Sequence, residues 1–198
     1  IEMISSHIWQ VHYNSNRTGI RLIGDKPQWA RNDGGEAGLH PSNIHDNAYA
    51  IGAIDFTGDM PIILGPDGPS LGGFVCPFVV IEADLWKIGQ LAAGDKVRLV
   101  PVNENEAKIA KTALNQAIKS LAEPKTDEIK TSGENSPIIK QYPKKGHEPE
   151  IYIRRQGDCN ILIEYGPIAL DIEIRLKVHA LMLELEKTEI KGIIDLTP

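Results

Sequence analysis

The chain has 198 residues, a net charge of −6, a hydrophobic fraction of 41% and a charged fraction of 24%. These values are ordinary for a globular protein, and the length suits one large domain or two small ones. The acidic balance, with a pI near 5.5, argues against a nucleic-acid surface, which needs clustered Lys and Arg. No apolar run approaches the length of a membrane span, so neither a membrane nor a nucleic acid is an expected partner.

The two cysteines and the N-terminus indicate a compartment and a piece of a longer protein. Cys76 and Cys159 lie far apart in sequence, without metal-ligand spacing. They are expected to be buried free thiols in a reducing cytoplasm. The chain starts at Ile1, without a secretory signal, and continues directly into a strand-like segment. We therefore expect a cytoplasmic fragment cut from a longer polypeptide.

The first part of the chain predicts short strands separated by turns. Apolar and β-branched residues predict strands at Ser6–Tyr13 and Thr18–Ile23, joined as a hairpin by an Asn-rich turn. The stretch from Gly38 to Pro77 then alternates loops of Gly, Pro, Asp and Asn with short apolar runs at Ala48–Ile54, Met60–Leu64 and Phe74–Cys76. Such alternation is typical of tightly wound β-structure.

Helices are expected after this β-rich stretch. Glu82–Leu91 predicts a short helix, followed by a strand at Lys96–Val100. Asn103 is a candidate N-cap with Glu106 as its capping partner. The helix Glu104–Leu121 should bury a face with a spacing of four, formed by Ile109, Ala113, Ala117 and Leu121.

A boundary is expected at 122–149, where Pro, Lys, Glu, Ser and Gly replace apolar residues. Beyond this linker, the pattern predicts strands at Glu150–Arg155 and Asn160–Glu164, a helix at Ala169–Lys187 and a final strand at Ile190–Leu196. Fewer than fifty residues cannot bury a sufficient core, so this second segment is also expected to be truncated.

Polar groups that can bind a ligand are concentrated in the central loops, at His40, Asn43, His45, Asp46, Asn47, Asp55, Asp59 and Asp67. Turn formation alone also explains Gly, Asn and Asp there. His40, His45 and Asp46 lack a convincing third metal ligand, so no metal is expected. Asp55 and Asp59 are either an acid/base pair or caps for backbone N–H groups. No phosphate-binding loop, dinucleotide motif or zinc motif is present. Residue chemistry alone therefore predicts a small-molecule or partner site on a β-scaffold.

Two long segments carry a family resemblance. Tyr13–Gly24 and His45–Pro77 resemble the carboxyltransferase region of fungal urea carboxylases, and more broadly the KipA-type family. The matching positions are Arg17, Gly19, Arg21-Leu22, Gly52-Ala53-Ile54, Pro61-Ile62-Ile63-Leu64, Asp67 and Gly72-Gly73-Phe74. After the linker, Gly157–Gly166 resembles the opening of the partner KipI-type domain.

The resemblance implies a fold and a reaction. The fold is mainly β with a few helices, built from cyclophilin-like β-barrel portions. A KipA-type part at 1–121 would be joined by the linker 122–149 to a truncated KipI-type part at 150–198. The reaction is transfer of a carboxyl group from carboxybiotin to urea, which forms allophanate. Biotin and ATP would be handled by biotin carboxyl carrier and biotin carboxylase domains of the same polypeptide, so the fragment should be inactive alone.

The resemblance also implies roles for individual residues. His45 and Asp55 are the candidate catalytic groups, with His40 as a second candidate for proton relay and substrate contact. Asn43, Asn47 and Asp55 carry groups that match urea, and Arg17 and Arg21 suit a carboxylate or oxyanion. Gly72 and Gly73 would allow close approach of the cofactor.

Two alternatives of other classes remain. KipA- and KipI-type proteins also occur as subunits of 5-oxoproline-cleaving enzymes and as kinase-regulatory binding modules. The segments His45-Asp46-Asn47 and Phe56–Asp59 resemble the urea carboxylase version of the motif. A structural alternative is a scaffold on which the biotin carrier docks.

Overall fold

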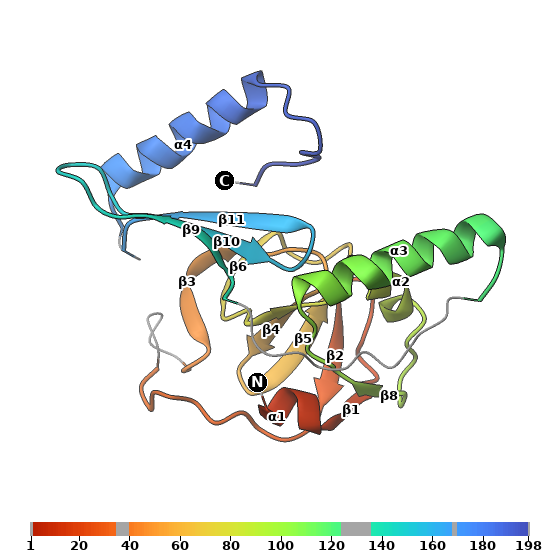
Figure 1. Ribbon diagram of the computed structural model, residues 1–198. Coiled ribbons are helices and arrows are strands. Elements are labelled where there is room, and N and C mark those ends of the chain that lie inside the picture. The colour runs from red at the N-terminus through yellow and green to blue at the C-terminus, as the bar shows by residue number, and fades with distance from the viewer. Residues whose placement is uncertain (1, 35–39, 124–135, 168–169, 198) are drawn as a thin grey trace. The chain divides into compact units, whose positions relative to one another are not determined.

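The computed structural model describes residues 2–34, 40–123, 136–167 and 170–197. The chain divides into two compact units, which are described separately below (Figure 1). Unit 1 comprises Ile1–Ser136 together with Gln156–Asn160, and unit 2 comprises Pro137–Arg155 together with Ile161–Pro198. Within the described residues, no helix is long and apolar enough to cross a bilayer.

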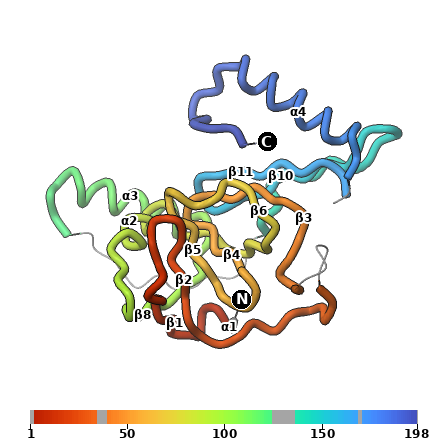
Figure 2. The backbone as a smooth tube through the Cα atoms, turned by 180° about the vertical axis from the view of Figure 1, so that it is seen from behind, coloured from red at the N-terminus to blue at the C-terminus, as the bar shows by residue number. Residues whose placement is uncertain are grey.

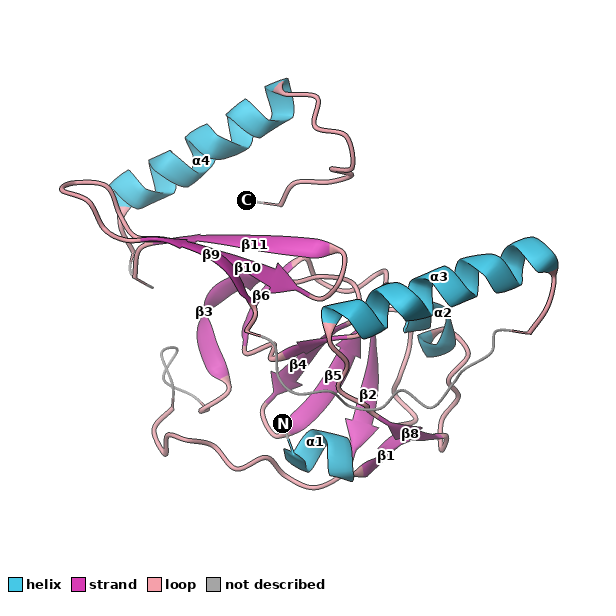
Figure 3. Cartoon of the chain, in the orientation of Figure 1, coloured by secondary structure: helices cyan, strands magenta, loops and turns pink. Residues whose placement is uncertain are grey.

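Unit 1 is built on a curled six-stranded sheet (Figure 3). The strand order is β7 (Phe78–Val79), β4 (Ala53–Thr57), β5 (Met60–Leu64), β2 (Gly19–Ile23), β1 (Ile8–Val11) and β8 (Lys96–Arg98). All neighbouring pairs are antiparallel. The β4–β5 hairpin turns through two residues, and Gly58 supplies the positive φ of 64° that such a tight turn requires. The expectation of a mainly β fold with a few helices is confirmed, and the predicted strands at β1, β2 and β5 are present.

Alternation along the strands gives the sheet two different faces. One face contributes Ile20, Leu22, Ile54, Phe56 and Ile63 to a core with Ile4, Trp9 and Val11. The residues between them on β4 and β5 point the other way, and Ala53 and Leu64 pack with Tyr49 in a second, smaller cluster. The second face also receives Asp55, which lies two residues after Ala53 on β4.

A separate two-stranded ribbon joins β3 (Asn43–Ala48) to β6 (Leu71–Phe74), and the two strands run side by side in the reverse view (Figure 2). The expected strand Ala48–Ile54 is wrong in its bounds. A turn at residues 51–52 separates β3 from β4, and Gly52 has a φ of 83° that ordinary residues rarely adopt. The apolar run therefore spans the end of one strand and the start of another.

The helices of unit 1 are α1 (Glu2–Ser6), the 3-10 turn η1 (Glu82–Asp84), α2 (Leu85–Ile88) and α3 (Glu104–Ser120). The capping box between Asn103 and Glu106 is confirmed. The predicted buried face of α3 is wrong, since Ile109 is 68% exposed and the buried residues include Ala107 and Ala117. Each step of four residues rotates by about 40° around a helix, so a series with that spacing drifts off one face; of the four predicted residues only Ala117 is buried, and Leu121 is 94% exposed.

Unit 2 contains the three-stranded sheet β11–β10–β9 and the helix α4 (Ile172–Lys187). Strands β10 (Ile151–Gln156) and β11 (Asn160–Tyr165) match the predicted hairpin. Strand β9 (Ile138–Tyr142) lies inside the expected linker at 122–149, of which residues 124–135 are outside the described part of the chain. The predicted start of the last helix at Ala169 is also outside it, and Asp171 caps α4 by accepting hydrogen bonds from the amides of Glu173 and Ile174.

The predicted final strand at Ile190–Leu196 is wrong. The segment turns instead, with the Ile193 amide donating to the Ile190 carbonyl and Gly192 at a φ of 104°. No strand is assigned in the described residues after α4, because nothing there pairs with this segment. It folds back along the helix (Figure 1).

Candidate functional site

The β3–β6 ribbon carries a β-bulge that contains the predicted catalytic histidine. Asn43 pairs with Phe74, and Asn47 pairs with Gly72. Three residues therefore lie between the paired positions on β3, but only one lies between them on β6. Ile44, His45 and Asp46 thus face the single residue Gly73, and both His45 and Asp46 are exposed. Bulges of this kind are common beside active sites, where they redirect side chains. The structure thus brings Asn43, His45 and Asn47 onto one short strand.

The glycines of β6 allow the ribbon to pack closely. A Cβ added at Gly72 would lie 2.4 Å from the Tyr49 ring, and one added at Gly73 would lie 3.1 Å from the Ile44 carbonyl oxygen in the bulge. Packing within unit 1 therefore already requires glycine at position 72 and favours it at 73. Contact of these glycines with a cofactor remains a prediction.

Tyr49 links the ribbon to the sheet. Its hydroxyl accepts a hydrogen bond from the Phe74 amide at 2.7 Å and donates one to the Phe74 carbonyl at 3.0 Å. The ring is buried against Ala53 and Leu64, and burial raises the pKa of its hydroxyl. Sequence reasoning missed this residue because no local pattern distinguishes it from a core tyrosine.

Asp55 is a buried carboxylate on the face of the sheet that receives Tyr49. It is 4% exposed, and its Oδ1 has no hydrogen-bond partner among the described residues. Burial raises the pKa of this carboxyl from 3.8 to about 6, against the opposing effects of a hydrogen bond from Thr57 and the charge of Arg21. An unpaired buried acceptor is costly, and such groups are typical of sites that bind a donor or move a proton.

Cys76 also lies in this environment. It packs against the cluster of Tyr49, Ala53 and Leu64. Burial and the negative charge of Asp55 raise the pKa of its thiol to about 12. The groups near Asp55 therefore include the uncharged Tyr49 hydroxyl, the uncharged Cys76 thiol and the positive charge of Arg21.

Comparison with known proteins identifies the family. Residues 1–101 match the model described as the carboxyltransferase domain, subdomain A and B. The chain belongs to this carboxyltransferase family. It is 46% identical over 202 residues to a urea amidolyase of Lachancea kluyveri and 40% identical over 197 residues to a putative urea carboxylase of Emericella nidulans. The match includes all of this chain and 11% of the first protein, and 91% of this chain and 16% of the second.

Solved structures agree with this assignment. The crystal structures of the K. lactis urea amidolyase and the Kluyveromyces lactis urea carboxylase each align with a TM-score of 0.85 and 46% identity. Each alignment covers 98% of this chain, but 12% of the amidolyase chain and 18% of the carboxylase chain. The carboxyltransferase segment therefore spans less than a fifth of the relatives that it matches.

The predicted arginines of the carboxyltransferase segment both have partners. Arg17 forms a two-bond ion pair with Asp67, with its Nε 2.5 Å and its Nη2 3.0 Å from the carboxylate oxygens, and its side chain is 75% exposed. This contact lowers the pKa of Asp67. Arg21 donates to the Asn14 carbonyl at 2.5 Å. Arg21, Ile62 and Asp55 are aligned across β2, β5 and β4, which places Arg21 on the Asp55 face of the sheet.

His40 lies in a different cluster from His45. Its Nδ1 accepts a hydrogen bond from the Ser42 amide at 3.1 Å and is 2.9 Å from the Ser42 hydroxyl, and its Nε2 is 3.5 Å from Asp59. Asp59 also accepts from the Trp29 indole N–H at 3.0 Å and pairs with Lys26. Asp59 therefore binds side chains of the loop that precedes β3, and its partners differ from those of Asp55.

One group of potential metal ligands occurs among the described residues of the segment. Atoms of Glu82, Asp158 and Cys159 lie within 4.8 Å of one another. The Lys111 ammonium pairs with Glu82, the Cys159 thiol donates to the same carboxylate at 2.7 Å, and Asp158 accepts from the Glu82 amide. These contacts describe an ion-pair cluster. Both cysteines are free, but Cys159 is exposed, so its predicted burial is wrong.

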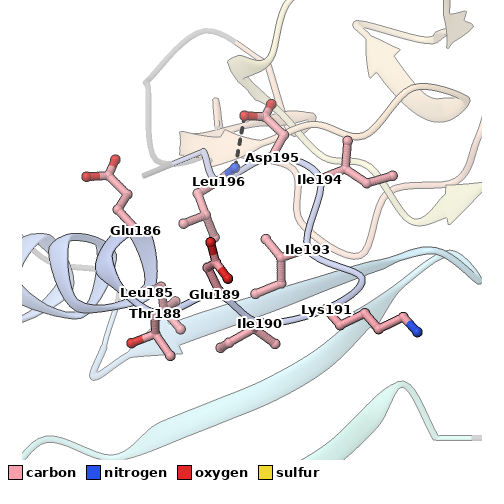
Figure 4. A pocket seen from close by; sticks show the side chains of 10 residues that line it. All are labelled: Leu185, Glu186, Thr188, Glu189, Ile190, Lys191, Ile193, Ile194, Asp195 and Leu196. Carbon is pink, nitrogen blue, oxygen red and sulfur yellow. Dashed lines mark hydrogen bonds between the residues drawn. The ribbon is translucent and has the colours of Figure 1, made fainter.

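Two hollows lie in unit 2, away from the predicted site residues. One, of about 510 Å³, lies between the end of α4 and the segment that follows it, and is lined by Leu185, Ile190, Ile193 and seven further residues (Figure 4). The other, of about 530 Å³, has a charged lining that includes Arg154, Glu164 and Lys177. None of the predicted site residues lines either hollow.

Proposed function

We propose that this chain contributes to the carboxyltransferase site of a longer, biotin-dependent urea carboxylase, in which a carboxyl group passes to urea and allophanate forms. The family match and 40% to 46% identity to urea amidolyases and a putative urea carboxylase support this proposal. The single observation that carries the site is the buried, unpartnered Oδ1 of Asp55. The proposal retains a KipA-type part at 1–121, a connection at 122–149 and a KipI-type part at 150–198, with cyclophilin-like barrels.

Urea is a small neutral molecule that offers N–H donors and one carbonyl acceptor. Asp55 Oδ1 has no donor within the part of the chain that the structure describes, and the amides of Asn43 and Asn47 can both donate and accept. We infer that Asp55 accepts an N–H of urea, while the β3 asparagines orient the molecule. Buried polar groups that are satisfied only by the correct ligand discriminate strongly against other ligands.

The transfer also requires removal of a proton from urea. Carboxybiotin, when bound, would supply the carboxyl group and would keep the electron pair of the N–C bond that is broken. As the urea nitrogen forms its new bond to carbon, Asp55 accepts the released proton. A pKa of about 6 leaves this carboxyl ionised but appreciably basic at neutral pH. We propose that His45, on the exposed bulge, passes that proton onward.

The charge near Asp55 favours urea over an anionic substrate. Asp46 and Asp55 both act electrostatically on Tyr49, so two acidic groups lie near that hydroxyl, against the positive charge of Arg21 that acts on Asp55. A second buried or half-buried carboxylate would be repelled there. 5-Oxoproline carries a carboxylate, which makes the 5-oxoproline-cleaving alternative less compatible with this site. The kinase-regulatory and carrier-docking alternatives use no buried proton acceptor.

The test uses the complete reading frame that carries this chain. ATP cleavage is measured in bicarbonate with urea and separately with 5-oxoproline, for the natural protein and for Asp55→Asn. We expect stimulation by urea, and a loss of about 100-fold or more in Asp55→Asn, the scale of a missing general base. The control is Asp25→Asn, whose side chain is 73% exposed. Stimulation by 5-oxoproline alone, or full activity in Asp55→Asn, would contradict the proposal.

A further inference from the structure

Arg31 binds the backbone at the point where β3 begins. Its Nε and Nη2 donate to the Pro41 carbonyl at 3.2 and 3.1 Å, and Nη2 also donates to the Asn43 carbonyl at 2.8 Å. The side chain is 36% exposed, and Asp33 approaches its Nε at 3.8 Å. One planar guanidinium therefore bridges two carbonyl groups that flank Ser42, a geometry that a single ammonium point charge cannot reproduce.

The backbone between these carbonyls is bound on its other sides as well. Ser42 is fully buried, its amide donates to His40 Nδ1, and its carbonyl accepts from the Val75 amide at 3.0 Å. The Asn43 amide donates to the His40 carbonyl at 2.9 Å. Residues 41–43 are thus connected both to the preceding loop, through Arg31 and His40, and to Val75, the residue that follows β6.

The pairing register of β3 and β6 depends on such contacts because no short turn connects these two strands. In a hairpin, a short loop sets the pairing of two strands. Here β3 and β6 are separated along the chain by β4 and β5, and they share three Cα pairs interrupted by the bulge. A slip of one residue moves every side chain of a strand to the opposite face. His45 and Asn47 would then no longer be presented as they are in this structure.

We propose that Arg31 is a positioning residue, which fixes the β3–β6 register and thereby sets the affinity of the site for urea. The second half of this statement rests on the proposed function. When only a fraction of molecules holds the competent register, the apparent affinity falls by that fraction, whereas the bound complex regains the correct arrangement. Loss of the Arg31 bonds should therefore raise KM for urea and leave kcat nearly unchanged.

The experiment compares Arg31→Lys with Arg98→Lys, a matched change at an exposed arginine on β8. Amide hydrogen exchange of this chain is followed at Val75, with Ile63 on β5 as the internal reference. We expect Arg31→Lys to accelerate exchange at Val75 by about tenfold or more, with Ile63 and the Arg98→Lys protein unchanged. The charge is kept in both variants, so a general electrostatic effect would appear in both.

The same variants are then assayed in the complete reading frame with urea. We expect KM for urea to rise by about tenfold in Arg31→Lys while kcat changes by less than about threefold. An unchanged rate of amide exchange at Val75 would overturn the role of Arg31 in fixing the β3–β6 register. Faster exchange with an unchanged KM for urea would overturn the link between that register and substrate affinity. Absence of urea-dependent activity in the natural protein would contradict the proposed function. The exchange rate at Val75 would still show whether Arg31 fixes the register.

Discussion

Replacing Asp55 by Asn should make the chain more stable at neutral and alkaline pH, although it removes a proposed catalytic group. The Asp55 carboxyl is 4% exposed, and burial raises its pKa from 3.8 to about 6. The folded state therefore binds the proton more tightly than the unfolded state does. The associated stability is fully present below about pH 3.8, is lost as the pH rises to about 6, and stays lost above that value.

The size of the effect follows from the same shift. A change from 3.8 to about 6 corresponds to about 3 kcal/mol of free energy of unfolding, because one pKa unit is worth about 1.4 kcal/mol. Asn has nearly the same shape and carries no charge at any pH. Asp55→Asn should therefore differ little from the natural chain near pH 4 and exceed its stability by up to about 3 kcal/mol near pH 8.

The assay is unfolding in guanidinium chloride, since urea is the proposed ligand, with tryptophan fluorescence, to which the fully buried Trp9 contributes, as the reporter. Curves are recorded for both proteins between about pH 4 and pH 8. Asp25 is 73% exposed and pairs with His7 at 3.2 Å, so Asp25→Asn should differ from the natural chain by less than about 1 kcal/mol at every pH. A difference in the free energy of unfolding between Asp55→Asn and the natural chain that does not increase with pH would refute the inference that ionised Asp55 destabilises the fold.

Two further predictions concern Tyr49 and the cysteines. Tyr49→Phe removes both hydrogen bonds between the Tyr49 hydroxyl and Phe74, so the free energy of unfolding, measured by thermal unfolding, should fall by about 1 to 3 kcal/mol. The control Tyr13→Phe, at a residue that is 76% exposed, should have no measurable effect in that experiment. An aromatic disulfide reagent near pH 8 should modify Cys159 first, because Cys159 is exposed and Cys76 is half-buried. The pKa of both thiols is raised, to about 11 for Cys159 and to about 12 for Cys76, so accessibility is the main difference between them. Labelling of Cys76 in the folded chain at a comparable rate, measured by peptide mass, would contradict its burial.

Much of the local structure and the family could be predicted from the sequence. The capping box of Asn103 and Glu106 and the strands near residues 8–11, 19–23 and 60–64 depend on neighbouring residues, which interact wherever the rest of the chain lies. The long matching segments around Arg17 and Gly72 identified the carboxyltransferase family before any geometry was known. In each case the signal is carried by residues that are close in sequence.

The tertiary structure decided which groups are buried and which meet. Asp55 looks like a turn residue in the sequence, but pairing of β4 with β5 and β7 buries it without a partner for Oδ1. Ile109 has the spacing of a buried residue and lies in solvent, and the apolar Ile190–Leu196 segment pairs with none of the described strands. The hydrogen bonds of Arg31 to the carbonyls of residues 41 and 43, and those of Tyr49 to Phe74, join residues that sequence periodicity does not relate. Burial and pairing depend on contacts between distant segments, so only the folded chain determines them.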